Sequence, residues 1–145
     1  MKTSPSLLSR PCICDPKAPL DQRYEKTESL PFTIRPVKTA AELEKAVQIR
    51  HAAYMRHVPR FAAALETPEA LDSARGVVVF LAELKLNASP VGTMRIQLNE
   101  FAPLTLERAV DLPDWLRCRR LAEPTRLGVT HERVGRIVTL ALFKA

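Results

Sequence analysis

Two short groups of polar residues have the types and spacing that chemistry requires. Glu123, Thr125 and Arg126 stand together in the run Glu-Pro-Thr-Arg. The guanidinium of Arg126 can hold a carboxylate through two parallel hydrogen bonds, either that of Glu123 or that of a bound substrate. Arg50 and Tyr54 are four residues apart, so on a helix they share one face and can line one wall of a cleft. Both groups also have structural interpretations, as a salt bridge or as part of the core.

Arg50 and Tyr54 belong to a segment whose sequence marks the start of a helix. Thr39 is a favourable N-cap residue, and Glu42 three positions later completes a capping box. Apolar residues then recur at helical spacing, which predicts an amphipathic helix that ends before Pro59. Residues 61–74 contain Pro68 and several acids, and they predict a loop with a helical turn.

The other polar group falls on a predicted strand. The continuously apolar run from Gly76 to Ala82 predicts a strand buried on both faces. A turn at residues 87–90 returns the chain as a hairpin over residues 91–98, which includes Arg95. Residues 121–129 predict a further strand, in which Pro124 removes a ladder donor and predicts a bulge.

Weaker patterns complete the predicted order of elements. Residues 32–37 predict a short first strand, and residues 101–117 predict a connection with a short helix near residues 106–110. We expect Trp115 to anchor this connection against the sheet. Residues 133–145 predict an apolar helix that is still running at its last residue.

These elements predict an α/β (α+β) fold: a mixed, mostly antiparallel twisted sheet flanked by helices, incomplete at its C-terminal end. Four prolines punctuate residues 1–30 and predict a disordered tail, which leaves residues 31–145 as the folded domain. At 145 residues the chain is one domain at most.

The composition limits the classes of partner. The formal charge of +6 predicts attraction to an acidic partner, such as nucleic acid, an anionic membrane, a phosphorylated cofactor or an acidic carrier protein. No run approaches the roughly 18 apolar residues of a membrane span. Cys12, Cys14 and Cys118 lack the spacing of a disulfide framework or a zinc site, so we expect no metal and a cytoplasmic location.

Three motifs follow one another along the chain: Arg50-x-x-x-Tyr54, Gly92-Thr93-Met94-Arg95 and Glu123-Pro124-Thr125-Arg126-Leu127-Gly128-Val129. In this order they resemble motifs of the autoinducer synthases and N-acyl amino acid synthases, which belong to the GNAT superfamily of N-acyltransferases. The resemblance spans residues 32–145. Asp72 falls where that family carries acidic residues, whereas Leu127 stands in place of the usual Phe.

The resemblance implies an enzyme that moves a fatty acyl group from a thioester to an amine, such as an amino acid. It implies that Glu123 is the general base, directly or through a water, with Thr125 and Arg126 beside it. A structural pairing of Glu123 with Arg119, Arg120 or Arg126 is the alternative. The residues that the resemblance assigns to substrate binding are Arg50, Tyr54, Asp72 and Arg95.

The acyl donor implied by the resemblance is coenzyme A or the phosphopantetheine of an acyl carrier protein, with no permanently bound cofactor. The superfamily's pyrophosphate loop, Arg/Gln-x-x-Gly-x-Gly/Ala, is matched poorly by the run that starts at Arg133, in which Gly135 comes one place early. Arg133, Gly135 and Arg136 are the candidate cofactor contacts. The poor match favours a carrier protein, which would meet the basic residues Arg117, Arg119 and Arg120.

Two other functions stay open. A catalytically inactive GNAT-like remnant is favoured by the lack of a fifth strand after the last helix. A small basic nucleic-acid-binding module is disfavoured because aromatic residues make up only 6% of the chain and no helix-turn-helix or finger pattern occurs.

Overall fold

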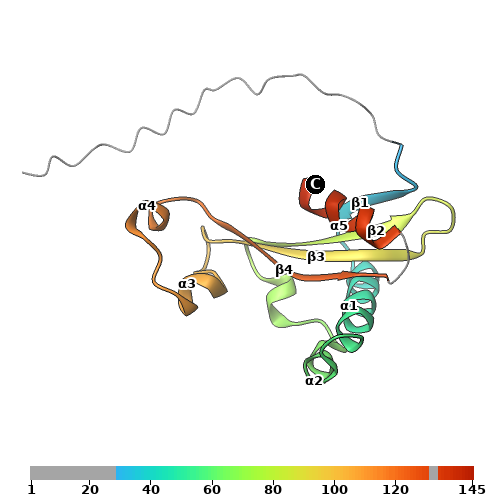
Figure 1. Cartoon of the computed structure of the whole chain (residues 1–145), viewed down its shortest axis with the longest axis horizontal. Helices are drawn as coiled ribbons and strands as arrows, with labels where there is room; N and C mark the ends of the chain where they lie inside the picture. The colour runs from blue at the N-terminus through green and yellow to red at the C-terminus, as the bar shows by residue number, and fades with distance from the viewer. Residues whose placement is uncertain (1–28, 131–133) are drawn as a thin grey trace, which may run out of the picture.

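The computed structural model describes residues 29–130 and 134–145. Most of the predicted tail lies outside these residues. Four strands form one antiparallel sheet in the order β1-β2-β3-β4 (Figure 1). They are β1 Phe32–Pro36, β2 Val77–Leu84, β3 Pro90–Leu98 and β4 Ala122–Val129. The predicted strands are therefore confirmed, as is an α/β (α+β) fold with an antiparallel sheet flanked by helices.

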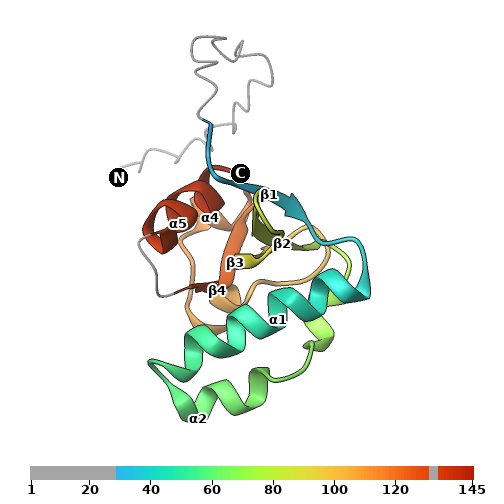
Figure 2. The same ribbon diagram turned by 90° about the vertical axis from the view of Figure 1, so that its right-hand side faces the viewer.

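Two helices cover opposite faces of this sheet. Helix α1, Ala40–Met55, begins with the predicted capping box of Thr39 and Glu42. Helix α5, Val134–Lys144, packs mainly against β3 on the other face. Figure 1 shows α5 above the sheet and α1 below it, and Figure 2 shows the same separation from the side.

Short helices fill the connections. After α1 come α2 Pro59–Ala62, η1 Ala63–Leu65 and η2 Ala70–Ser73, where the sequence predicted a loop with one helical turn. Between β3 and β4 lie α3 Thr105–Ala109, which confirms the predicted short helix, and α4 Asp114–Arg117. Trp115 does not anchor this connection against the sheet, because its residue is 63% exposed on the short α4.

The two faces of the sheet differ in chemistry. The α5 face is apolar, and its buried residues include Ala82, Met94 and Val138. The α1 face has a smaller apolar cluster, and it also buries Thr93 and Arg95. A buried guanidinium has to be paired, because an isolated charge in a protein interior is very costly. The α1 face is therefore where the charged residues of the fold gather.

The bulge of β4 lies at Arg126 and Leu127, two residues beyond the predicted position. Thr125 pairs with Arg95 and Gly128 pairs with Thr93, so two steps of β3 match three steps of β4. Pro124 keeps a regular place in the ladder because β4 is an edge strand, where a missing N–H can face away from β3. Arg126 adopts a left-handed backbone with φ of 55°, which is uncommon for a residue with a side chain.

Two glycines allow the helices to approach the sheet closely. A Cβ on Gly92 would overlap a methyl group of Val138 in α5. A Cβ on Gly128 would lie 3.0 Å from the Cα of Arg50 in α1. The second contact brings Arg50 down onto β4, where it reaches the charged residues of the sheet.

Candidate active site

Five charged side chains meet between α1, η2 and the sheet. Three are the guanidinium groups of Arg50, Arg95 and Arg126, and two are the carboxylates of Glu69 and Asp72. We name this group the charge network. It contains three positive and two negative charges, so it carries a net charge of +1 when all five are ionised.

Asp72 is the buried centre of the charge network. Its side chain is fully enclosed and accepts hydrogen bonds from both Nη atoms of Arg50, at 2.9 and 3.0 Å. Arg95 Nη1 donates to its Oδ1 at 3.0 Å, and the backbone N–H of Glu69 donates to its Oδ2 at 2.9 Å. Burial alone would raise the pKa of Asp72, but the hydrogen bonds from Arg50 and Glu69 outweigh it and leave that pKa below its ordinary value.

Glu69 joins all three arginines. Arg126 donates to it from Nε and Nη2, each at 2.6 Å, and Arg95 and Arg50 donate to Oε2 at 3.0 and 3.2 Å. The hydrogen bonds from Arg126 lower the pKa of Glu69 against the opposing effect of burial. Glu69 is therefore a carboxylate that stays ionised near neutral pH.

Arg126 lies on the outer side of the charge network and against an aromatic pair. Its guanidinium carbon is 4.9 Å from the centre of the Phe61 ring, at a distance suited to a cation–π contact. The ring of Tyr54 packs on the same Phe61, with the centroids 5.6 Å apart. Tyr54 thus lies next to the charge network, as the sequence analysis expected of a residue on the Arg50 face of α1.

An apolar cleft runs along the edge of β4 beside this aromatic pair. Its volume is about 230 Å³. Most of its lining is apolar or backbone, with Arg56 and His57 at its border. We name it the edge cleft. Its other lining residues are Ala53, Tyr54, Val58, Leu127, Gly128 and Val129.

Glu123 and Thr125 lie on the same face of the sheet as the charge network. Thr125 Oγ1 accepts a hydrogen bond from Arg95 Nε at 3.1 Å. Glu123 lies two residues earlier, about 7 Å along the strand, and its Oε2 accepts from the backbone N–H of Thr105 at 2.8 Å. Glu123 thus holds the start of α3 rather than pairing with Arg119, Arg120 or Arg126.

The candidate cofactor contacts are only partly described. Arg133 lies outside the described residues. Gly135 is buried at the start of α5, where a Cβ would press on the carbonyl of Thr130, and Arg136 is exposed. Close packing therefore explains Gly135 without a phosphate.

The proposed carrier-protein surface has acids of its own. Arg117 pairs with Asp111, and Arg120 pairs with Glu100 at 2.9 Å. Arg119 lies 6.0 Å from the centre of the Trp115 ring. The basic run is therefore partly neutralised.

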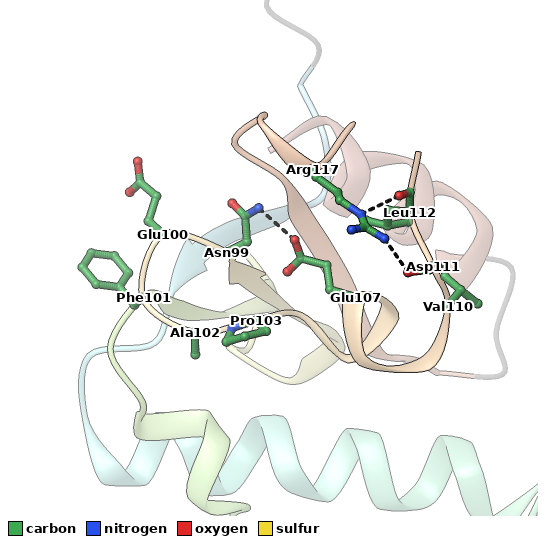
Figure 3. A pocket seen from close by; sticks show the side chains of 10 residues that line it. All are labelled: Asn99, Glu100, Phe101, Ala102, Pro103, Glu107, Val110, Asp111, Leu112 and Arg117. Carbon is green, nitrogen blue, oxygen red and sulfur yellow. Dashed lines mark hydrogen bonds and ion pairs between the residues drawn. The ribbon is translucent and has the colours of Figure 1, made fainter. Parts of the chain in front are cut away.

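A separate cavity of about 610 Å³ lies in the α3–α4 connection. Figure 3 shows Asn99 turned towards Glu107, and Arg117 turned towards Asp111 and the carbonyl of Leu112. These contacts are made within the connection, and none of them reaches the charge network.

Glu69 contacts every arginine of the charge network, but it was not among the site residues predicted from the sequence. Its spacing from Asp72 was the available signal, because residues three apart in one helical turn face the same way. The predicted carboxylate partner of Arg126 was either Glu123 or a bound substrate, whereas the side chain that it contacts is Glu69. Phe61, which supports Arg126, was assigned to a loop.

In residues 29–130 and 134–145, no helix is long and apolar enough to cross a membrane, and no group of three or more His, Cys, Asp and Glu is arranged for a metal ion. Searches against protein-family models, curated proteins and solved structures each found no match.

Proposed function

We propose that this chain is an N-acyltransferase that moves a fatty acyl group from a thioester to an amine. The observation that carries the proposal is the bulge of β4, which separates the charge network from the edge cleft. Charged groups on one side suit a polar acceptor, and the apolar groove on the other suits an acyl chain. The resemblance of the three motifs supports the same reaction.

In this reaction the amine nitrogen attacks the thioester carbonyl, a C–N bond forms and the C–S bond breaks. The amine gives up a proton to a base, and the leaving thiolate takes up a proton. The protein therefore has to supply a proton acceptor, a donor for the developing oxyanion and a slot for the chain.

Glu123 is the base in this proposal. The two acids of the charge network, Glu69 and Asp72, are held by guanidinium groups and have lowered pKa values, which makes them weak proton acceptors. Within the described part of the chain no guanidinium contacts Glu123, and only its Oε2 accepts hydrogen bonds. Its Oε1 is then the atom that receives the proton.

The oxyanion donor in this proposal is the backbone N–H of Leu127. Val129 turns its carbonyl towards Arg56, whose Nη2 donates to it at 2.6 Å, on the side of β4 away from β3. Leu127 lies in the bulge between the ladder pairs of Thr125 and Gly128, and it lines the edge cleft, so we place its N–H at the developing oxyanion. A fixed backbone donor of this kind stabilises negative charge without reorganising.

The acyl donor is an acyl carrier protein or coenzyme A, and the reaction is cytoplasmic. Arg119 is the basic residue of the run near α4 with no acidic side chain against it among the described residues. It is the residue of that run best suited to meet an acidic carrier protein.

The test is a turnover assay with the purified chain. Decanoyl thioester on a carrier protein or on coenzyme A is mixed with amino acids and simple amines, and N-decanoyl products are measured by mass spectrometry. We expect Glu123→Gln to lower kcat by about 100-fold or more. Glu44→Gln, which removes an exposed acid of α1, is the matched control and keeps full activity. Absence of product from every donor and acceptor contradicts the proposal.

A binding domain without turnover is the second candidate. Both carboxylates of the charge network, Glu69 and Asp72, are paired with arginines, which favours a structural role for them. Among the described residues, Glu123 is then the one acid beside the network that no arginine contacts. Saturable binding of an acyl thioester together with no product would support it.

A further inference from the structure

Helix α5 is apolar on the side that faces solvent as well as on the side that packs on the sheet. Its packed side contains the buried residues Val138 and Leu142. Its other side contains Ile137, Leu140 and Phe143, which are 49%, 74% and 59% exposed. A helix that is apolar all around its axis is normally covered on every side. The exposed side of α5 therefore indicates a binding surface.

The exposed side of α5 continues into a groove between α5 and β1. The groove has a volume of about 410 Å³, and its lining residues are apolar except for Lys144. Leu30 and Ile34 line it from the side of β1, and Leu140 lines it from α5. Figure 2 shows the C-terminal end of α5 next to the start of β1. We name this groove, together with the exposed side of α5, the α5 surface.

The charged side chains around the α5 surface are basic. Arg136 and Lys144 are exposed on α5 itself. Lys85 is exposed at the turn between β2 and β3, and its backbone N–H donates to the carbonyl of Pro31 at 2.9 Å, which places this turn beside the start of β1. The ion pairs formed within residues 29–130 and 134–145 include none of these three side chains.

The segments that form this surface contain no acidic side chain. Residues 29–36, 84–91 and 134–145 have neither Asp nor Glu. Glu83, which precedes the second segment, is buried and pairs with Arg35 and with Lys45 of α1. This pairing lies on the α1 face of the sheet, so Glu83 does not neutralise the α5 surface and Arg35 does not add to its charge.

A second copy of the chain fits this surface poorly. In a two-fold dimer the same surface meets itself, so Arg136 and Lys144 of both copies would approach with no acidic side chain of these segments between them. An anionic lipid surface matches both properties, because its headgroups attract basic residues and its acyl chains accept apolar ones. At 11 residues α5 is too short to cross a bilayer but long enough to lie along one.

We propose that the α5 surface binds the surface of an anionic lipid bilayer. Ile137, Leu140 and Phe143 enter the boundary between headgroups and acyl chains, and Arg136 and Lys144 contact headgroup phosphates. The charge network lies on the α1 face of the sheet and stays open to water, as the positions of α1 and α5 in Figure 1 show. The inference does not depend on the proposed function, because the groove shares no lining residue with the edge cleft.

Sedimentation with lipid vesicles tests the proposal on the whole chain. Purified protein is mixed with vesicles of phosphatidylcholine alone, or of equal parts of phosphatidylcholine and phosphatidylglycerol, and the bound fraction is measured against lipid concentration. Each basic residue near the headgroups should tighten binding about fivefold. We therefore expect at least about tenfold tighter binding to the anionic vesicles. Equal binding to both kinds of vesicle, or binding to neither, overturns the proposal.

Two Leu→Glu variants test whether the exposed side of α5 makes the contact. Leu140→Glu removes an inserted side chain and adds a negative charge, so binding to the anionic vesicles should weaken about tenfold or more. Leu106→Glu makes the same change at an exposed position of α3 and should leave binding nearly unchanged. Unfolding midpoints equal to that of the wild type show that both variants are folded. Equal weakening by the two variants, or none by either, overturns the proposal.

Two pairs of charge substitutions test which basic residues face the lipid. Arg136→Gln combined with Lys144→Gln should weaken binding about 25-fold, as two such residues require. Arg119→Gln combined with Arg120→Gln removes the same charge beside α4 and should have a much smaller effect. Binding that is lost only in the second pair would place the lipid at α4 and overturn the proposal. A dimer in light scattering that Leu140→Glu dissociates, without any vesicle binding, would assign the surface to a second copy instead.

Discussion

Arg126 and Glu69 are 57 residues apart in the sequence and face each other through two hydrogen bonds of 2.6 Å. The contact ties the bulge of β4 to the short helix η2, and it orders a loop that has few apolar residues in the core. Because the pair is partly exposed while Asp72 is enclosed, the two acids of the charge network should differ in their contribution to stability.

We expect Asp72→Asn to destabilise the protein more than Glu69→Gln. Asp72→Asn leaves Arg50 and Arg95 buried beside a neutral amide, which costs about 3–5 kcal/mol. The side chain of Glu69 is 24% exposed, so water can screen the arginine charges when Glu69→Gln removes their carboxylate partner. The free energy of unfolding should therefore fall by only about 1–3 kcal/mol. Urea unfolding of both variants, with Glu44→Gln as the surface control, measures the difference. Equal costs would contradict the assignment of Asp72 as the centre of the network.

The protein should lose stability in acid. Four carboxylates have pKa values lowered by folding: Glu42, Glu69, Asp72 and Glu83. The backbone N–H of Lys38 and the guanidinium of Arg35 lower the pKa of Glu42 from 4.5 to about 2. The unfolded chain therefore binds protons first, and the free energy of unfolding falls between about pH 5 and pH 2.

The thermal midpoint measured at constant ionic strength from pH 7 to pH 3 checks this expectation. Above about pH 5 the four carboxylates are ionised in the folded and in the unfolded state. Their titration should therefore leave the thermal midpoint nearly independent of pH in that range. Glu42→Gln should make the acid fall shallower, because that group no longer titrates. A midpoint that rises on acidification would refute the prediction.

Gly92 and Val138 should show strong energetic coupling. Gly92→Ala places a methyl group against Val138 and should cost about 1–3 kcal/mol through overpacking. In a Val138→Ala background the same change fills the space that was vacated, so its cost should be smaller by about 1 kcal/mol. A double-mutant cycle from urea unfolding gives this value. Additive costs would mean that α5 does not rest on Gly92.

Glu123→Gln should leave the fold intact, whereas Glu123→Ala should loosen α3. The amide oxygen of glutamine can still accept from the backbone N–H of Thr105, but alanine leaves that group without its partner, at a cost of about 1 kcal/mol. Hydrogen exchange over residues 104–109 should rise in the alanine variant alone. Faster exchange in both variants would mean that the negative charge of Glu123, and not only its hydrogen-bonding oxygen, holds α3. A loss of activity in Glu123→Gln would then report the loosened helix as well as the missing base.

The sequence predicted the regular elements well because their signals are local. The capping box at Thr39 and the apolar run of β2 depend on neighbouring residues only, and both elements form where the pattern placed them. The short α4 and the exposure of Trp115 were not predicted, because the position of this connection depends on distant contacts such as the hydrogen bond from Leu121 to Asn99.

The site was predicted only in part, for the same reason. Arg50, Arg95 and Arg126 were named from their motifs, and they do come together with Asp72. Their remaining partner, Glu69, could not be chosen among the acids of residues 61–74 without knowing how η2 packs. Pro124 drew attention to a bulge, but the sequence does not reveal which residue adopts positive φ.

The bulge of β4 also limits how this strand can change in length. Before it, Thr125 faces α1, and after it Leu127 and Val129 pack on the apolar face beneath α5. Deleting Arg126 would remove the bulge and restore regular pairing, with Thr125 and Gly128 still opposite Arg95 and Thr93, so the flanking side chains would keep their faces. A single-residue insertion or deletion at a regular position of β4 would instead turn the side chains beyond it to the opposite face, so the bulge is the one place in this strand where the length can change by one residue without reversing the two faces.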